Sequence, residues 1–342
     1  MTEKIIECIK ENPLLSSKEI HEKLPDELGY ATLKRTLSKL VKEKLISTIG
    51  KSRATKYKIS PAYQLFYPIN LETYFEKETD ERKAEDSFNL ILIKEILNEI
   101  ELFTDEELEK LTTSQNQYKK NSLELSKFQY DRELERLAID LSWKSSQIEG
   151  NTYSLLETER LLKEKETAKG KTKDEAIMLL NHKDALDFII ENPDYLIPLT
   201  VSKIEDTHSL LIKELGIDRN IRQRRVGITG TNYRPLDNEF QIKEALRDMC
   251  TLVNSRQNVF EKALLLLVLI SYIQAFNDGN KRTARIISNA ILINYGYCPI
   301  SFRTVDSIDY KKAMLIFYEQ NNITAFKKIF IEQFEFAVKT YF

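Results

Sequence analysis

The sequence predicts a mostly helical protein: a helical bundle that carries a small β-hairpin, with a separate small domain at its N-terminus. Three observations support this fold class. The 342 residues include only nine Gly and eight Pro, and apolar residues recur with a period near 3.6 over long stretches. The chain is 42% hydrophobic and 30% charged, the balance of a soluble globular protein. Its length is too great for one ordinary core, so we expect two or three domains.

The overall charge is close to neutral. Lys and Arg number 51 and Asp and Glu 53, for a net charge of -2, so any nucleic-acid binding would need a local basic patch. The longest apolar run, residues 263–270, is far too short to cross a membrane and predicts a buried helix. Cys8, Cys250 and Cys298 form neither a disulfide framework nor a metal-ligand pattern. Because the N-terminus also has no apolar signal core, we expect a cytoplasmic protein without a membrane partner.

Residues 1–60 form the first predicted domain. Serine caps, the Asn12-Pro13 stop and short alternating runs give three helices followed by a hairpin. The expected ranges are 2–10, 16–24 and 30–44 for the helices, and 45–49 and 55–59 for the strands. Three helices followed by a hairpin resemble a winged helix-turn-helix domain.

A cluster of positive charge occupies the second half of this domain. Between Tyr30 and Ser60 there are nine basic residues and one acid, Glu43, which leaves about eight positive charges for phosphate contacts. The alternative is a solvated surface on a protein-interaction module. We favour contact with double-stranded DNA because the third helix and the hairpin are basic together. The expected contact residues are Lys34, Arg35, Lys39, Lys51, Arg53 and Lys56.

The rest of the chain divides into two predicted parts. Residues 61–110 begin as a proline- and aromatic-rich linker and continue as a helical extension. Residues 111–342 repeat helix after helix and form the main bundle, including a helix at about 132–150. The exception is residues 224–235, whose alternation and glycines predict a hairpin.

The strongest functional signal lies between two helices of that bundle, at residues 274–285. A glycine-containing turn that opens a helix presents free backbone N–H groups and the positive end of the helix dipole, which together bind anions. Lys281, Arg282 and Arg285 add positive charge, and Asp278 supplies an oxygen ligand of the kind that Mg²⁺ takes beside phosphates. The pattern predicts a site for a metal–nucleotide polyphosphate. On spacing alone, an ordinary surface turn with helix-end charges explains it equally well.

The segment is similar to the signature of the Fic (Fido) family, His-x-Phe-x-(Asp/Glu)-Gly-Asn-Gly-Arg-x-x-Arg. Further family elements follow in the right order. Residues 145–150 fit the inhibitory motif (Ser/Thr)-x-x-x-Glu-(Gly/Asn), and residues 224–235 fall where the family has its target-docking flap. Four elements over residues 145–313 identify the chain as a member. The residues that match the signature and the family's tail pattern are Phe276, Asp278, Gly279, Asn280, Arg282, Arg285, Gly296, Pro299, Asp309 and Tyr310.

The resemblance implies an enzyme that transfers AMP from ATP to a Ser, Thr or Tyr hydroxyl of a target protein. Asp278 would hold Mg²⁺, while Gly279 and Asn280 would form an anion hole for the α- and β-phosphates. Arg282 would contact the phosphates, with Lys281 beside it, and Arg285 would pair with the γ-phosphate. The flap would hold the target by strand addition, through Thr229, Gly230, Thr231, Asn232 and Tyr233.

The inhibitory motif implies a brake. Ser145 and Glu149 are four apart and share one face of a helix, which ends near Gly150. A Glu149 carboxylate that reaches Arg285 would occupy the partner of the γ-phosphate. The alternative is an ordinary cap or surface ion pair, which contributes little.

Two positions depart from the family pattern. Gln274 stands where the family has its catalytic histidine, and a neutral amide cannot accept the proton of the target hydroxyl; such a loss costs roughly 10²- to 10⁴-fold. Lys281 stands where the third glycine is usual, and here the chain resembles the Doc toxins of the same superfamily, which phosphorylate their targets. Three functions stay open: an impaired adenylyltransferase, a DNA-binding regulator with a non-catalytic Fic module, and a Doc-like kinase. A homodimer is left open too.

Overall fold

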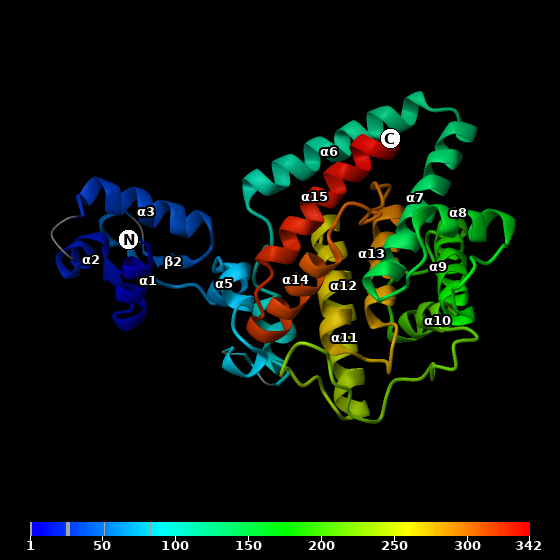
Figure 1. Ribbon diagram of the computed structural model, residues 1–342. Coiled ribbons are helices and arrows are strands. Elements are labelled where there is room, and N and C mark those ends of the chain that lie inside the picture. The colour runs from blue at the N-terminus through cyan, green and yellow to red at the C-terminus, as the bar shows by residue number, and fades with distance from the viewer. Residues whose placement is uncertain (1, 25–27, 51, 83, 86) are drawn as a thin grey trace. The chain divides into compact units, whose positions relative to one another are not determined.

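The computed structural model describes residues 2–24, 28–50, 52–82, 84–85 and 87–342. The chain is mostly helical with one small three-stranded sheet, as the sequence predicts (Figure 1). It divides into two compact units. The smaller unit is Met1–Asn70 with Gln320–Thr324, and the larger is Leu71–Glu319 with Ala325–Phe342.

The smaller unit contains the helices and the hairpin expected near the N-terminus. A capping box between Ser16 and Glu19 starts its second helix. Its sheet has the order β1-β3-β2, and both pairs are antiparallel. The first strand was not expected, because two residues are too few to show an alternating pattern. The elements are α1 (Thr2–Glu11), β1 (Leu15–Ser16), α2 (Ser17–Lys23), α3 (Tyr30–Lys42), β2 (Ile46–Ile49), η1 (Ser52–Ala54), β3 (Lys56–Ile59) and α4 (Tyr63–Phe66).

The larger unit is a bundle of helices. Several of them begin at a Ser or Thr whose side chain caps the helix, with Glu or Gln three residues later. Its elements are α5 (Leu71–Phe75), η2 (Thr79–Glu81), η3 (Leu92–Ile96), α6 (Asp105–Glu124), α7 (Lys127–Ile148), α8 (Leu155–Glu164), α9 (Lys173–Glu191), α10 (Val201–Leu211), α11 (Glu239–Ser255), α12 (Val259–Ile273), α13 (Asn280–Asn294), α14 (Ser307–Gln320) and α15 (Thr324–Tyr341).

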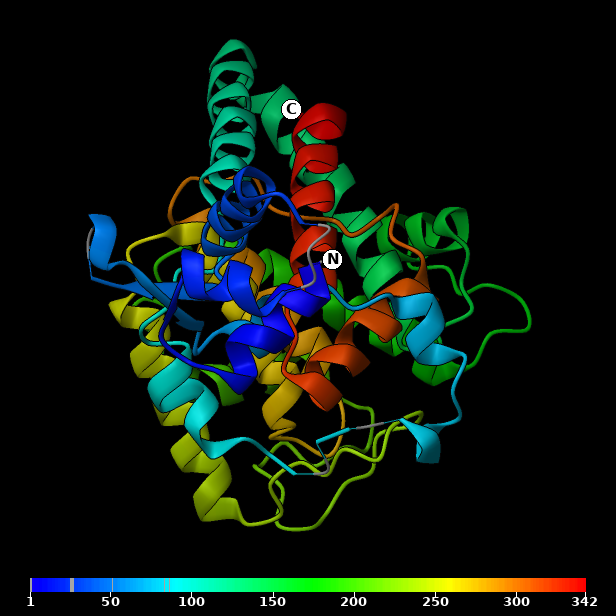
Figure 2. The same cartoon turned by 90° about the vertical axis from the view of Figure 1, so that its left-hand side faces the viewer.

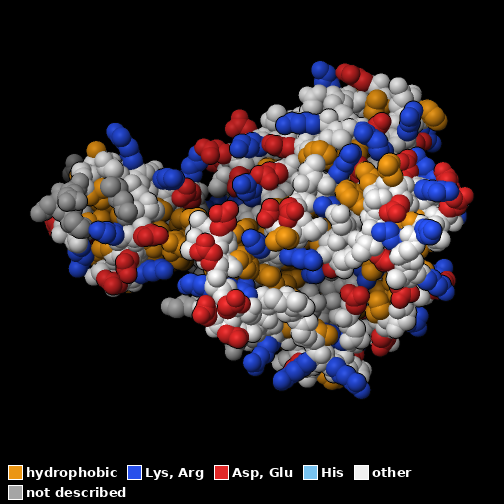
Figure 3. Space-filling view, in the orientation of Figure 1, with side chains coloured by type: hydrophobic (Ala, Val, Ile, Leu, Met, Phe, Trp, Pro, Cys, Tyr) orange, Lys and Arg blue, Asp and Glu red, His pale blue; other side chains and the backbone are white. Residues whose placement is uncertain are grey.

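Helix α12 is the centre of this bundle. Every residue of α12 is buried, including the apolar run 263–270 that predicted a buried helix. It packs against α11 and α13, and Figure 2 shows the bundle from a second side. None of the helices in the described ranges is long and apolar enough to cross a membrane. Acidic and basic side chains are interspersed over the visible face of the larger unit (Figure 3).

The hairpin predicted at residues 224–235 does not form. These residues are extended and irregular, and they form no strand ladder with each other. The one bridge recorded here joins Arg234 to Ser87 in parallel. Two backbone carbonyls of this segment, those of Arg224 and Gly230, instead accept hydrogen bonds from the side chains of Arg222 and Arg82, so these two are satisfied without cross-strand pairing.

Helix α7 begins earlier and ends earlier than the predicted helix at about 132–150. Ser126 caps its start through Gln129. Glu149 is its C-terminal cap, and Gly150 has a left-handed φ of 102°. The motif therefore places Glu149 at the end of a helix, where the next residue turns the chain away.

Candidate functional site

The turn between α12 and α13 is folded around the side chain of Asn280. Its Oδ1 accepts a hydrogen bond from Phe276 N at 2.9 Å. Its Nδ2 donates to Phe276 O at 2.8 Å and to Gln274 Oε1 at 3.2 Å. Gln274 and Gly279, at the two ends of the turn, both have left-handed backbones, with φ of 51° and 80°. The turn therefore has one fixed shape, which leaves the first N–H groups of α13 at the surface of a cavity.

A buried histidine supports this turn from behind. The His208 ring, on α10, stacks on Phe276 with centroids 3.7 Å apart and planes at 5°. Burial lowers the pKa of His208 to about 4, so at neutral pH the ring is uncharged. Its Nε2 donates to the carbonyl of Asp278 at 2.9 Å. A Cβ on Gly279 would lie 3.3 Å from both this ring and Ile212 Cγ2, so the position favours glycine for packing as well as for conformation.

Glu149 bridges two cations of α13. Its Oε1 accepts from Arg285 Nη2 at 2.9 Å, and its Oε2 accepts from Lys281 Nζ at 3.0 Å. Arg285 is fully buried and also donates to Ser145, from Nε to Oγ at 2.8 Å and from Nη2 to the carbonyl at 2.9 Å. Burial by itself would raise the pKa of the Glu149 carboxyl, but the charges of Arg285 and Lys281 outweigh it and lower the pKa to about 2. The carboxylate is therefore ionised at any ordinary pH.

Asp278 is the exposed acid of the turn. Its side chain is 63% exposed, while Oδ1 accepts from Gly279 N at 2.6 Å and Oδ2 from Arg282 Nη2 at 3.2 Å. One anchored carboxylate with accessible oxygens suits Mg²⁺, which commonly binds one or two carboxylates, water and substrate phosphates. Among the described residues no group of three or more His, Cys, Asp or Glu could hold a metal alone. The site fits Mg²⁺ only together with a phosphate.

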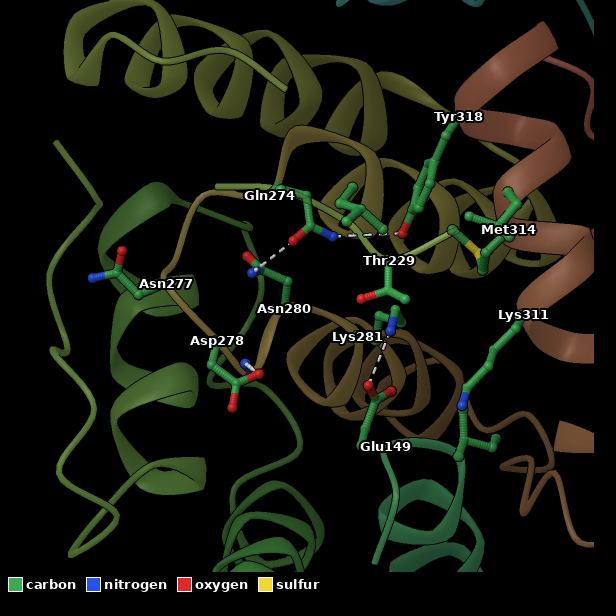
Figure 4. A pocket seen from close by; sticks show the side chains of 15 residues that line it. Glu149, Thr229, Gln274, Asn277, Asp278, Asn280, Lys281, Lys311, Met314 and Tyr318 are labelled. Atoms are coloured by element: carbon green, nitrogen blue, oxygen red, sulfur yellow. Dashed lines mark hydrogen bonds and ion pairs between the residues drawn. The ribbon is translucent and has the colours of Figure 1, made fainter. Parts of the chain in front are cut away.

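The turn forms one side of a cavity of about 370 Å³. Glu149 lies at the end of α7, and residues 227–229 form another wall (Figure 4). Lys311, Met314 and Tyr318 of α14 complete it. The sequence reasoning did not include these three residues, although Lys311 directly follows the Asp309-Tyr310 pair of the tail pattern. Their contribution depends on how α14 packs, and its sequence pattern does not report that.

Gln274 faces the cavity but its amide is already engaged. Nε2 donates to Ser271 O at 2.6 Å and lies 3.5 Å from Tyr318 Oη, while Oε1 accepts from Asn280. Burial raises the pKa of the Tyr318 hydroxyl well above its ordinary value, so Tyr318 is protonated at neutral pH. Neither the protonated Tyr318 hydroxyl nor the Asn280 amide supplies a base at this position.

The structure brings most of the predicted site residues of the larger unit together. Those that line the cavity are Glu149, Thr229, Gln274, Asp278, Gly279, Asn280 and Lys281. Ser145, Arg282 and Arg285 are buried; Arg282 bonds to Asp278 and Arg285 to Glu149, and Ser145 bonds to Arg285 behind them. Gly150 follows Glu149 along the chain and is not among the lining residues.

The remaining predicted flap residues do not line the cavity. Tyr233 is buried, and its hydroxyl donates to Tyr272 O at 3.0 Å. Gly230, Thr231, Asn232 and Tyr233 are not among the lining residues. Of the predicted flap residues, only Thr229 lines the cavity.

The predicted DNA-contact residues belong to the smaller unit. Lys34, Arg35 and Lys39 are exposed along α3, and Lys56 is exposed on β3. Lys51 and the side chain of Arg53 lie outside the described residues.

Known proteins are similar to this chain in sequence over part of its length. Residues 198–292 match the model of the Fic/DOC family. The protein adenylyltransferase Fic of Nematostella vectensis is 27% identical over 175 residues, which cover 49% of this chain and 40% of that relative. The protein of the same name from Aedes aegypti is 26% identical over 162 residues, 45% of this chain and 32% of that relative. The match thus covers less than half the length of each of these relatives.

Solved structures share the fold. A fragment of Fic-1 from C. elegans has a TM-score of 0.61 at 19% identity, over 69% of this chain and 71% of that one. A Fic family protein from Desulfovibrio desulfuricans has a TM-score of 0.58 at 19% identity, over 69% and 74%. The solved structures thus show a shared fold, and the family-model match places a Fic/Fido family domain at residues 198–292. The matched segment includes the whole turn from Gln274 to Arg285.

Proposed function

We propose that this chain binds Mg-ATP in the cavity at the α12–α13 turn and is a protein adenylyltransferase by ancestry, restrained by Glu149. One observation carries the proposal: the first residues of α13 and the exposed carboxylate of Asp278 line one cavity, and two buried arginines lie directly behind it, Arg282 on Asp278 and Arg285 on Glu149. Helix N–H groups with fixed cations favour a polyphosphate. The adenylyltransferase names of the relatives support ATP as the nucleotide.

Asp278 and the phosphates would share the Mg²⁺ ion, which would neutralise charge on the leaving group. The first N–H groups of α13 would receive the α- and β-phosphates. Arg285 would pair with the γ-phosphate once Glu149 is displaced, because the Glu149 carboxylate and the γ-phosphate compete for the same guanidinium. Lys281, which binds the other oxygen of Glu149, would be released in the same event.

In AMP transfer the oxygen of the target hydroxyl attacks the α-phosphorus, the α–β bridging P–O bond breaks, and pyrophosphate leaves. The hydroxyl proton must pass to a base. The Gln274 amide cannot accept it, and its two polar ends are held by Ser271 and Asn280. We therefore expect transfer to be roughly 10²- to 10⁴-fold slower than with a positioned base.

Nucleotide binding is tested first. Mg-ATP is titrated calorimetrically into the wild type, Glu149→Ala and the matched control Glu135→Ala. Glu135 is also on α7 and pairs with Lys183 at 3.3 Å, but it is half exposed and does not line the cavity. We expect Glu149→Ala to bind more tightly than the wild type and the control to match the wild type. If none of the three proteins binds Mg-ATP, the proposal of a nucleotide site in this cavity is wrong.

Transfer is tested by restoring the base. Gln274→His/Glu149→Ala and Gln274→His/Glu135→Ala are incubated with Mg-ATP, and the intact mass is measured with α- or γ-labelled nucleotide. A gain of AMP in the first variant supports adenylyltransferase ancestry. A gain of phosphate with γ-label indicates the Doc-like kinase chemistry that Lys281 suggests. No change in mass argues against both transfer reactions.

A second candidate function is DNA binding by the smaller unit, which we infer to be a winged helix-turn-helix domain. The exposure of Lys34, Arg35 and Lys39 along α3 favours it. Reversal of these three to Glu should abolish salt-dependent binding to duplex DNA. The control reverses three exposed lysines of the larger unit to Glu, Lys110, Lys120 and Lys127, which changes the net charge by the same amount. Equal binding by both triple variants would exclude α3 as the contact.

A further inference from the structure

The wall of the cavity formed by residues 227–229 has no secondary structure of its own. The segment from 222 to 236, here called the wall loop, forms no strand ladder, and its one backbone bridge joins Arg234 to Ser87. A loop without a strand ladder is held by the side chains that bond to its backbone and by its own side chains that bond elsewhere. Two buried arginines, one at its base and one at its tip, bond to its backbone carbonyls, and the buried Tyr233 adds an anchor through Tyr272 O.

Arg222 holds the base of the wall loop. It is 1% exposed, and its guanidinium donates to three backbone carbonyls: Gln274 O from Nε at 2.5 Å, Arg224 O from Nη1 at 2.8 Å, and Leu236 O from Nη2. Its own N–H donates to Ala275 O at 3.0 Å. One side chain therefore joins both ends of the loop to Gln274, the residue that opens the α12–α13 turn.

Arg82 holds the tip. It is 9% exposed, and its Nη2 donates to Gly230 O at 2.8 Å and to Thr79 Oγ1 at 2.7 Å. Its Nη1 pairs with Glu319 Oε1 at 3.2 Å, at the end of the helix that supplies the opposite wall of the cavity. Beside it, Asn232 Nδ2 donates to Asp80 Oδ1 at 2.9 Å.

We propose that Arg222 and Arg82 are positioning residues. They set the width of the cavity by fixing the wall loop to the α12–α13 turn and to α14. Neither lines the cavity, so the role we assign to each is indirect. Arg222 acts through Gln274 and the two ends of the loop. Arg82 acts through Gly230 and Glu319. A planar guanidinium can serve several acceptors in fixed directions, which a lysine cannot.

The test combines hydrogen exchange of the wall loop with ATP affinity, which rests on the proposed function. Arg222→Gln, Arg222→Lys, Arg82→Gln and Arg82→Lys are made in the Glu149→Ala background. The control is Arg225→Gln, because Arg225 is on the same loop, is 81% exposed and pairs only at the surface with Asp237 at 2.6 Å. The Lys variants retain charge, and they guard against a failure of the Gln variants to fold.

We expect exchange at residues 227–235 to rise roughly tenfold or more in the Arg222 and Arg82 variants, because buried carbonyls lose their donors. Exchange in α12 should stay unchanged, and ATP affinity should fall severalfold. Lysine should not restore the wild-type exchange, and Arg225→Gln should match the parent. The proposal is overturned if the loop exchanges as before, or if α12 and the loop accelerate equally. If no variant binds ATP, the nucleotide proposal fails while the exchange result still decides the positioning role.

Discussion

At the scale of single residues, the site is governed by competition for a buried arginine. Arg285 has no exposed surface, so its charge needs a partner inside the protein. Glu149 provides one in this structure, and a phosphate would be the alternative. Lys281 binds the second oxygen of the same carboxylate, so the lysine at this position strengthens the hold on Glu149 and also leaves a second cation ready for a phosphate.

The first prediction concerns acid stability. The pKa of Glu149 is lowered from 4.5 to about 2 in the folded chain, so its contribution to stability is fully present above pH 4.5 and is lost as the pH falls toward 2. This contribution of the Glu149 carboxylate to the free energy of unfolding is about 3 kcal/mol. The free energy of unfolding of the wild type should therefore exceed that of Glu149→Gln at pH 6, and the gap should close by pH 2. Urea unfolding at each pH measures it.

Glu135→Gln is the control for this prediction. Its carboxylate pairs with Lys183 but is 46% exposed, and such pairs contribute little. Its unfolding curve should follow the wild type at every pH. A Glu149→Gln protein whose deficit is independent of pH would contradict the charge assignment.

At the scale of elements, the α12–α13 junction determines the site. Helix α12 ends where Gln274 turns left-handed, and α13 starts where Gly279 does the same. The six residues 274–279 connect the two helices, and Asn280 and His208 hold them in place. This is why the first residues of α13 and the wall loop line one cavity.

The second prediction compares two glycines with the same backbone. Gly279 and Gly170 both have φ of 80°, but only Gly279 has neighbours where a Cβ would lie, His208 and Ile212 at 3.3 Å. Both Ala substitutions cost about 1–2 kcal/mol from the left-handed backbone. Gly279→Ala should lose about 1 kcal/mol or more beyond that, because the stacked and hydrogen-bonded His208 cannot move away. Urea unfolding of the two variants gives the difference, and equal losses would show that the turn tolerates a methyl group.

At the scale of the whole molecule, the chain is two compact units, and the proposed ligand concerns only the larger one. The third prediction follows from linkage. In the Glu149→Ala protein, Mg-ATP at about a hundred times its Kd should stabilise the unit that binds it by about 2.7 kcal/mol. The slowest-exchanging amides of α12 should be protected further, while those of α3 should not change. Equal protection of α3 would show that both units unfold together.

Much of the fold was predictable because its signals are local. The helical periodicity, the serine and threonine caps and the apolar run 263–270 place the helices to within a few residues. The turn at 274–285 was predictable for the same reason, since its glycine, acid and arginines lie within twelve residues. The prediction of a hairpin at 224–235 was wrong, because alternation shows only that a segment is extended. It does not show which partner satisfies the backbone.

The sequence by itself determined which chemistry the turn offers: an acid, a glycine, an asparagine and three cations, with an amide where a base would be needed. Only the tertiary structure decided that Glu149 bridges Arg285 and Lys281, that α14 closes the cavity with Lys311 and Tyr318, and that Arg222 and Arg82 hold the wall loop. Several of these contacts join residues 52 to 237 positions apart, and the acceptors of a buried guanidinium are set by the geometry of the folded core. No local pattern records that choice.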